Sequence, residues 1–221
     1  MIIGVTGSFG AGKTTVANMF KKQGFRVINV DKSYSEIYRK NAPLKNKIKK
    51  EFGTLDRNKI KKIVFNNYNK LKKLNKITHP LIIKELKDQI STIIKKSNKK
   101  YSIFKKRNNK NLIINKKIKF IGKNNIGTDN VKIIIDAPLL IEAGAGGLVD
   151  KLIVVECSKK EQIKRILKKK KYIKKEINNI LKSQMPLKEK IKKADFVIDN
   201  NKSIKNTSMQ VKILANILQK P

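Results

Sequence analysis

The residues best suited to chemistry stand near the start of the chain, in Gly7-Ser8-Phe9-Gly10-Ala11-Gly12-Lys13-Thr14. This segment fits the phosphate-binding pattern G-x-x-x-x-G-K-[ST] at every fixed position. In such a loop the backbone N–H groups curl round a phosphate, the lysine reaches the β- and γ-phosphates, and the hydroxyl after it ligates Mg²⁺. The alternative is a glycine-rich turn that contains a lysine by chance.

The surrounding residues favour the phosphate-binding interpretation. Residues 1–6 are apolar and β-branched, which is typical of a buried strand. Residues 15–22 place Val16, Met19 and Phe20 on one helix face. A strand, a glycine loop and a helix N-terminus together form an anion site. The residues expected to hold a nucleoside triphosphate are Gly10, Ala11, Gly12, Lys13, Thr14 and Thr15.

Two carboxylates follow predicted strands. Asp31 comes after the run 25–30, and Asp136 comes after Ile133-Ile134-Ile135. Open α/β sheets bind ligands at the carboxyl ends of their strands, so both side chains are candidates. We expect Asp136 to hold Mg²⁺ together with Thr14, and Asp31 to accept a proton from an attacking hydroxyl. The alternative for either aspartate is a helix N-cap.

His79 is the only histidine, and Cys157 is the only cysteine. His79-Pro80 is expected to interrupt a long helical pattern, where a purely structural histidine is the competing interpretation. Cys157 follows an apolar run and is interpreted as a packed small side chain. A single cysteine excludes an internal disulfide and a cysteine-based metal site.

Five predicted strands separated by helices imply an α/β fold with a parallel sheet covered on both faces. The later strands are expected at 132–135, 151–156 and 196–198, and a closing helix at 204–218. Residues 32–97 are expected to be mostly helical, with breaks at 41–43 and 52–54, and residues 159–193 to be helical with a break near Pro186.

Residues 99–131 are expected to form a surface insertion, because two polar, turn-prone stretches flank a short apolar part. Within it, Leu112–Ile114 and Ile118–Ile121 could pair as a small hairpin.

The formal net charge of +38 raises the possibility of nucleic-acid binding. However, 49 of the basic residues are lysine and five are arginine, whereas nucleic-acid sites favour arginine. We therefore expect a lysine-rich solvated surface that steers polyanionic substrates, and no specific nucleic-acid partner.

No apolar run is long enough for a membrane span and no signal peptide is evident, so a cytoplasmic protein without a membrane partner is expected.

Several motifs together resemble dephospho-CoA kinase, the family that catalyses the last step of coenzyme A synthesis. The resemblance runs through most of the chain, and it rests on 4–17, Asn29-Val30-Asp31, 52–57, 63–65, 74–82, Asp136 to Glu142, Gln184-Met185-Pro186, Lys190 and 194–200.

The resemblance implies a P-loop kinase fold and ATP-dependent phosphorylation of the ribose 3′-hydroxyl of dephospho-CoA, with Mg²⁺. It implies catalytic roles for Lys13 and Asp31, an ATP contact for Arg165, and an acceptor site that includes Asp31, His79, Pro138 and Leu139. It also implies one domain, with a core (1–31, 132–164, 194–221), an acceptor-binding region (32–98), the insertion (99–131) and a lid (165–193).

Some positions depart from the family pattern. Asn29 replaces the first acid of Asp-x-Asp, and Ser35 stands near a usual arginine. In the lid, Lys169 and Ile180 replace two further arginines. Three alternatives therefore stay open: another nucleoside or nucleotide kinase, a basic nucleic-acid-binding protein that uses its P-loop as a switch, and a degenerate, inactive kinase. The oligomeric state is left open.

Overall fold

The computed structural model describes residues 1–108, 131–170 and 172–219. A five-stranded sheet in the order β2-β3-β1-β4-β5 forms its centre, and every neighbouring pair of strands is parallel. The strands are β1 (Ile2–Thr6), β2 (Arg26–Asn29), β3 (Ile133–Asp136), β4 (Lys151–Glu156) and β5 (Phe196–Asp199). The predicted parallel α/β sheet is therefore confirmed.

The strand register brings the candidate residues to one edge of the sheet. Asp136 pairs with Val5 of β1 on one side and with Asn29 of β2 on the other. The second strand is shorter than the expected 25–30, because the Asn29 side chain caps a helix that begins at Val30. The carboxyl ends of β1, β2 and β3 therefore lie together beside the phosphate loop.

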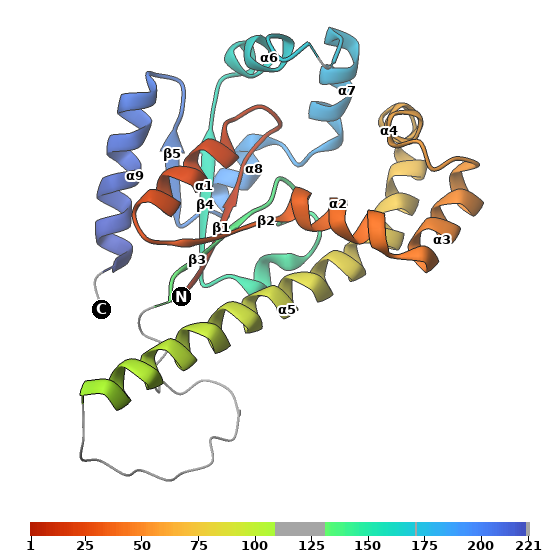
Figure 1. The fold of residues 1–221 in the computed structure, drawn as a ribbon. Helices are drawn as coiled ribbons and strands as arrows, with labels where there is room; N and C mark the ends of the chain where they lie inside the picture. Colours follow the sequence, from red (N-terminus) through yellow and green to blue (C-terminus); the bar gives the residue numbers. More distant parts are fainter. Residues whose placement is uncertain (109–130, 171, 220–221) are drawn as a thin grey trace.

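Helices cover both faces of the sheet (Figure 1). On one face, α1 (Lys13–Lys22) and α9 (Ile204–Gln219) bury Phe20 and Leu214 against Ile3 and Ile153. On the other face, Leu86 and Ile90 of α5 (Tyr68–Asn108) pack in a second cluster with Ile133 and Ile135. Burial on both faces explains why the strands are apolar at nearly every position.

A third apolar cluster lies beside the sheet, among the helices of region 32–98. Leu44, Ile48 and Phe52 pack there against Ile60 and Val64. The helices are α2 (Val30–Lys40), α3 (Ala42–Phe52) and α4 (Arg57–Asn66), followed by α5. The predicted breaks at 41–43 and 52–54 are confirmed, the first by the Asn41 cap and the second by Gly53 at a φ of 70°.

The predicted interruption at His79-Pro80 is wrong, because α5 continues through both residues. Pro80 removes one backbone N–H, but it is exposed, so the carbonyl of Lys76 that lacks its helical donor lies toward solvent. The buried side chains Leu71, Thr78 and Leu86 hold the helix on both sides of the proline. Tertiary packing thus outweighs the local preference of proline.

The helix α5 extends to Asn108, beyond the helical region expected to end near residue 97, and the bounds of the expected insertion stay a prediction. The hairpin expected from Leu112–Ile114 and Ile118–Ile121 lies outside the described residues.

Segment 159–193 forms three helices: α6 (Lys159–Leu167), α7 (Lys174–Ser183) and α8 (Leu187–Lys192). The break near Pro186 is confirmed, since Pro186 is the N-cap of α8. The break between α6 and α7 was not expected, and Lys170 there has a φ of 53°.

After β4, a buried Cys157 packs in the core as expected. No described helix has the length and apolar character needed to cross a membrane.

Replacing Pro80 by alanine tests the continuity of α5. If α5 is helical through this exposed position, Pro80→Ala should raise the free energy of unfolding by about 1–3 kcal/mol, because proline is about 3 kcal/mol worse than alanine inside a helix. Urea unfolding followed by circular dichroism measures this change, with Lys84→Ala as the control at another exposed position of α5. An unchanged or lower free energy of unfolding would show a true helix break.

Candidate functional site

The phosphate loop joins β1 to α1 and leaves the first turn of the helix open. Gly12 is the N-cap, no side chain accepts a hydrogen bond from the helix N-terminus, and no acidic residue stands in the first turn. The first N–H groups of α1 therefore have no side-chain acceptor, and they match the needs of a phosphate group.

Gly12 must be glycine for two reasons. Its φ is 95°, in the left-handed region, and a Cβ atom there would lie 2.2 Å from Nδ2 of Asn200. Asn200 is buried, its Nδ2 donates to the Ala11 carbonyl over 2.7 Å, and its Oδ1 accepts from the Thr207 hydroxyl over 2.8 Å. The loop after β5 thus supports the phosphate loop from behind.

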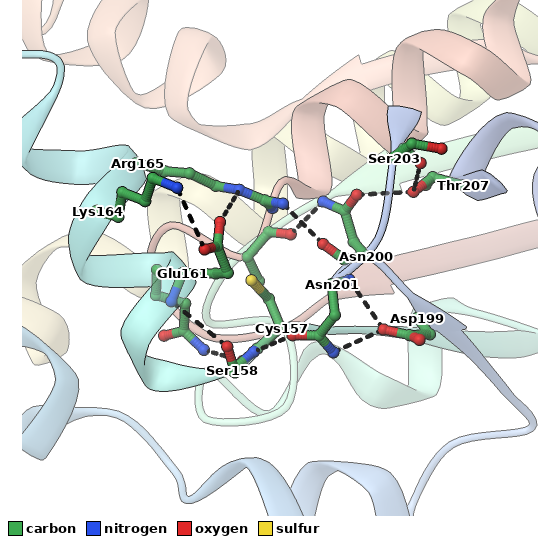
Figure 2. A network of polar contacts seen from close by, with 12 residues as sticks. Cys157, Ser158, Glu161, Lys164, Arg165, Asp199, Asn200, Asn201, Ser203 and Thr207 are labelled. Atoms are coloured by element: carbon green, nitrogen blue, oxygen red, sulfur yellow. Dashed lines mark hydrogen bonds and ion pairs between the residues drawn. The ribbon is translucent and has the colours of Figure 1, made fainter. Parts of the chain in front are cut away.

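Arg165 belongs to the same polar network (Figure 2). Its Nη2 donates to the Asn200 carbonyl over 2.8 Å, and its Nε lies 3.8 Å from the Glu161 carboxylate. These contacts place the guanidinium beside Gly12, and the predicted contact of Arg165 with ATP stays a prediction. Asn200 belongs to the motif 194–200, but nothing in its local sequence indicates that it supports the phosphate loop.

Lys13 is buried, and its Nζ donates to the Ser8 carbonyl over 2.9 Å. Burial lowers the pKa of the Lys13 ammonium to about 8, while the nearby carboxylates of Asp136 and Asp31 oppose this shift. At neutral pH the ammonium is therefore mostly protonated. A positive charge with few water contacts interacts strongly with phosphate oxygens.

A single carboxylate oxygen of Asp136, at the end of β3, accepts hydrogen bonds from side chains of α1 and of β2. Its Oδ2 accepts hydrogen bonds from the Thr14 hydroxyl and from the Asn29 amide, each over 2.7 Å. The side chain is only 3 % exposed, and burial raises the pKa of its carboxyl group. No helix cap is made by Asp136, because the chain continues in turns as far as η1 (Ala145–Leu148).

Asp31 lies in the first turn of α2, but its carboxylate is not the cap of that helix. The cap is Asn29, whose Oδ1 accepts from the Lys32 N–H over 2.9 Å. Among the described residues, the Asp31 carboxylate accepts no hydrogen bond and forms no ion pair. Because the neighbouring asparagine makes the cap, the exposed Asp31 carboxylate stays available at the edge of the phosphate site.

A cavity of about 500 Å³ opens next to Asp31. Its walls come from α2, α4, α5, the loop after β3 and α7, and most of its lining is apolar. All four predicted acceptor residues line it: Asp31, His79, Pro138 and Leu139. Their roles stay a prediction, but the structure brings them together in one place from three separate stretches of sequence.

His79 is half-buried on the wall of this cavity. Burial lowers the pKa of its imidazole, and the negative charge of Glu142 acts against that effect. Under neutral conditions the side chain is mainly an uncharged imidazole, which can both donate and accept a hydrogen bond.

Glu142 and Lys190 form a buried ion pair that sequence reasoning did not assign. Lys190 Nζ lies 2.8 Å from Glu142 Oε1 and donates to the Pro138 carbonyl over 2.9 Å. Glu142 Oε1 also accepts from the Met185 N–H over 3.1 Å. The pair therefore ties the loop after β3 to the turn between α7 and α8. Both residues stand in the quoted motifs, but a lysine in a lysine-rich chain gives no local signal of burial.

The segment 165–193 contacts the phosphate loop and α4. Gln184 Oε1 accepts from the Phe9 N–H over 2.8 Å, and the Phe9 and Tyr172 rings meet edge to face at 5.3 Å. Asn179 Nδ2 donates to Asn66 Oδ1 over 2.8 Å. Ile180 is 5 % exposed and lines the cavity, whereas Lys169 is exposed. At position 180 the chain therefore offers the cavity an apolar side chain in place of a charge.

Comparison with known proteins finds a family model and relatives that share one name. The model of the dephospho-CoA kinase family matches residues 1–106 and 101–206. A dephospho-CoA kinase of Carboxydothermus hydrogenoformans is 35 % identical, over 99 % of this chain and 93 % of that protein. One of Fusobacterium nucleatum is 34 % identical, over 96 % of this chain and 95 % of that protein.

Solved structures show the same fold. TT1252 from Thermus thermophilus superposes with a TM-score of 0.70 and 24 % identity, covering 99 % of this chain and 97 % of its own. Dephospho-CoA kinase from Campylobacter jejuni superposes with a TM-score of 0.60 and 24 % identity, covering 99 % of this chain and 96 % of its own. Taken with the family model and the full-length relatives, the phosphate loop, the strand-end aspartates and the adjoining cavity show that this chain belongs to the dephospho-CoA kinase family.

Proposed function

We propose that this protein transfers the γ-phosphoryl group of ATP to the ribose 3′-hydroxyl of dephospho-CoA. The proposal rests mainly on the position of the cavity, which is lined by the acceptor residues and adjoins the phosphate loop at Asp31. The negative charge of Asp31 is close enough to act on Lys13. A phosphoryl donor on the loop and a hydroxyl acceptor in the cavity would meet between these two side chains. Membership of the family supports the choice of acceptor.

Lys13 and the N-terminus of α1 supply positive charge where the transferred phosphoryl group would lie. Phosphoryl transfer requires positioning and electrostatic stabilisation more than covalent chemistry from the protein. The buried Lys13 ammonium is suited to that task, because charges interact more strongly where water is excluded. Arg165 adds a second cation on the nucleotide side of the loop.

Thr14 and Asp136 fit a magnesium ion bound with the nucleotide. A hydroxyl and a carboxylate oxygen already meet over 2.7 Å, and Mg²⁺ in such sites takes few protein ligands besides phosphate oxygens and water. When bound, Mg²⁺ neutralises charge on the phosphates.

Asp31 is proposed as the base that accepts the proton of the acceptor hydroxyl. Its exposed carboxylate lines the cavity and is not used as a helix cap. His79, Pro138 and Leu139, which line the same cavity, would orient the acceptor. Segment 165–193 would act as a lid that limits access of water to the phosphoryl group, since it contacts Phe9 of the phosphate loop and Asn66 of α4.

The activity itself is tested by coupled ADP release. The protein should release ADP from MgATP rapidly with dephospho-CoA and at least about 100-fold more slowly with adenosine, deoxyadenosine or AMP, because only dephospho-CoA fills the largely apolar cavity beyond its ribose. Equal or faster turnover of a nucleoside would show that the protein is a different kinase. Release of ADP with no acceptor at all would show simple hydrolysis.

Substitution of Lys13 tests the charge at the phosphate site. Lys13→Ala should lower kcat/KM by a factor on the order of 10³ or more, because it removes a buried cation from the transferring group. Lys21→Ala, an exposed lysine on the same helix, should leave kcat/KM unchanged. Thermal unfolding of both variants confirms that they fold, and near-normal activity in a folded Lys13→Ala variant would refute the role of Lys13.

Substitution of Asp31 separates base catalysis from a structural role. Asp31→Asn keeps the size of the side chain and removes its basicity, so kcat should fall by about 10²- to 10⁴-fold while the affinity for ATP stays nearly constant. Glu36→Gln, an exposed acid one turn further along α2, serves as the control. The assignment fails if kcat is unchanged, or if the variant loses ATP binding and folding together.

A further inference from the structure

Arg57 presents a fixed guanidinium group to the cavity. It is the first residue of α4, and its Cζ atom lies 5.5 Å from the ring centres of both Tyr34 and Tyr38. Its Nη1 donates to the Ser35 hydroxyl over 3.2 Å. All four side chains line the cavity, so a cation stands at its wall between two aromatic faces.

No acid neutralises this cation among the residues that the structure describes. None of their ion pairs involves Arg57. The adjacent Asp56 uses its carboxylate as the cap of α4, where it accepts from the Asn58 and Lys59 N–H groups. The guanidinium therefore keeps its full charge toward the cavity.

The surroundings of Arg57 hold it in position. The Tyr38 hydroxyl donates to the Leu55 carbonyl over 2.6 Å, which joins α2 to the turn that precedes Arg57. The Ser35 hydroxyl is itself fixed, since it donates to the Asp31 carbonyl over 2.8 Å. Aromatic faces and a hydroxyl orient a guanidinium without cancelling its charge, and the planar group retains free N–H donors for a bidentate anion contact.

The spacing along α2 relates this cation to the reacting hydroxyl. Ser35 lies one helical turn, about 6 Å, beyond Asp31, and Tyr38 lies about 10 Å beyond it. In dephospho-CoA the 5′-pyrophosphate is attached to the same ribose that carries the 3′-hydroxyl. When that hydroxyl is at Asp31, the first phosphates of the acceptor lie within a comparable distance, and Arg57 is placed to meet them.

We infer that Arg57, held by Tyr34, Tyr38 and Ser35, binds the pyrophosphate group of the acceptor and thereby sets its position in the cavity. The inference rests on the proposed function and adds a specificity-determining contact to it. Under the proposed function, the phosphates of ATP would bind separately, at the phosphate loop and the open N-terminus of α1. Lys61, the other cation that lines the cavity, lies over the Tyr172 ring at 5.7 Å and faces segment 165–193.

Steady-state kinetics with dephospho-CoA as the varied substrate test this assignment. Arg57→Met keeps an apolar stem between the tyrosines and removes the charge. It should raise KM for dephospho-CoA by about 10- to 100-fold, the loss expected for hydrogen bonds to a charged group, with kcat and the KM for ATP changed less than about threefold. Arg57→Lys should give an intermediate KM, because lysine keeps the charge and loses the planar fork.

Lys59→Met is the matched control, since Lys59 is an exposed cation on the same helix turn that does not line the cavity. It removes the same charge from the surface and should leave KM unchanged. Calorimetric titration of dephospho-CoA in the absence of ATP should show the same order of affinities: unaltered protein and Lys59→Met, then Arg57→Lys, then Arg57→Met.

The outcomes separate the two proposals. If the unaltered protein does not turn over dephospho-CoA, the proposed function is wrong. If it does, the inference about Arg57 is refuted by an unchanged KM in Arg57→Met, by an equal rise of KM in Lys59→Met, or by a fall of kcat at constant KM. Should Arg57→Met fail to fold, a normal KM in a folded Arg57→Lys variant together with normal calorimetric affinity would equally refute it.

Discussion

The hydrogen bonds that converge on Oδ2 of Asp136 fix the relation between the two halves of the site. One bond comes from Thr14, at the start of α1, and the other comes from Asn29, at the end of β2. Asn29 caps α2 with the other end of its amide, so the position of Asp136 determines where α2 begins. The phosphate loop and the helix that carries Asp31 are thus joined through one buried carboxylate.

This arrangement gives a physical account of Asn29, which departs from the acid found in the family. An aspartate at this position would place two carboxylates in contact, and one of them would need a proton or a cation. The amide instead donates to Asp136 and accepts from the Lys32 N–H, so both of its ends are satisfied without a counter-ion. The departure is therefore compatible with an intact site, so Asn29 no longer argues for a degenerate kinase, whereas Ile180 is the other departure behind that alternative.

The ion pair of Lys190 and Glu142 holds the second boundary of the cavity. It joins the loop that carries Pro138 to the turn after α7, while Gln184 joins the same turn to the phosphate loop. A buried pair of this kind is costly to break, because removal of one partner leaves the other charged and desolvated. The part of segment 165–193 that follows α7 is consequently held in place. The contacts of Tyr172 and Asn179 are made by the part that precedes it in the sequence.

Much of the fold could be predicted because its signals are local. The phosphate loop is a contiguous motif, and the apolar strands with their glycine and aspartate ends indicate a parallel sheet. The continuity of α5 through Pro80 could not be predicted, because it depends on side chains far along the helix that pack against the sheet and α2. The same is true of the contacts of Arg57 with Ser35, of Lys190 with Pro138 and of Asn200 with Ala11, whose partners are 22, 52 and 189 residues apart in the sequence. Such residues carry no pattern that distinguishes them from a solvated surface until the chain is folded.

In the proposed reaction, the phosphate loop and the cavity act on one hydroxyl group, the ribose 3′-hydroxyl of dephospho-CoA. The most direct measurement is ³¹P NMR of the product made from ATP and dephospho-CoA, with proton coupling to locate the new phosphate on the ribose. We expect a single new phosphomonoester coupled to H3′, in amounts equal to the ADP released. A phosphomonoester at the 2′-position, or ADP accompanied only by inorganic phosphate, would contradict it.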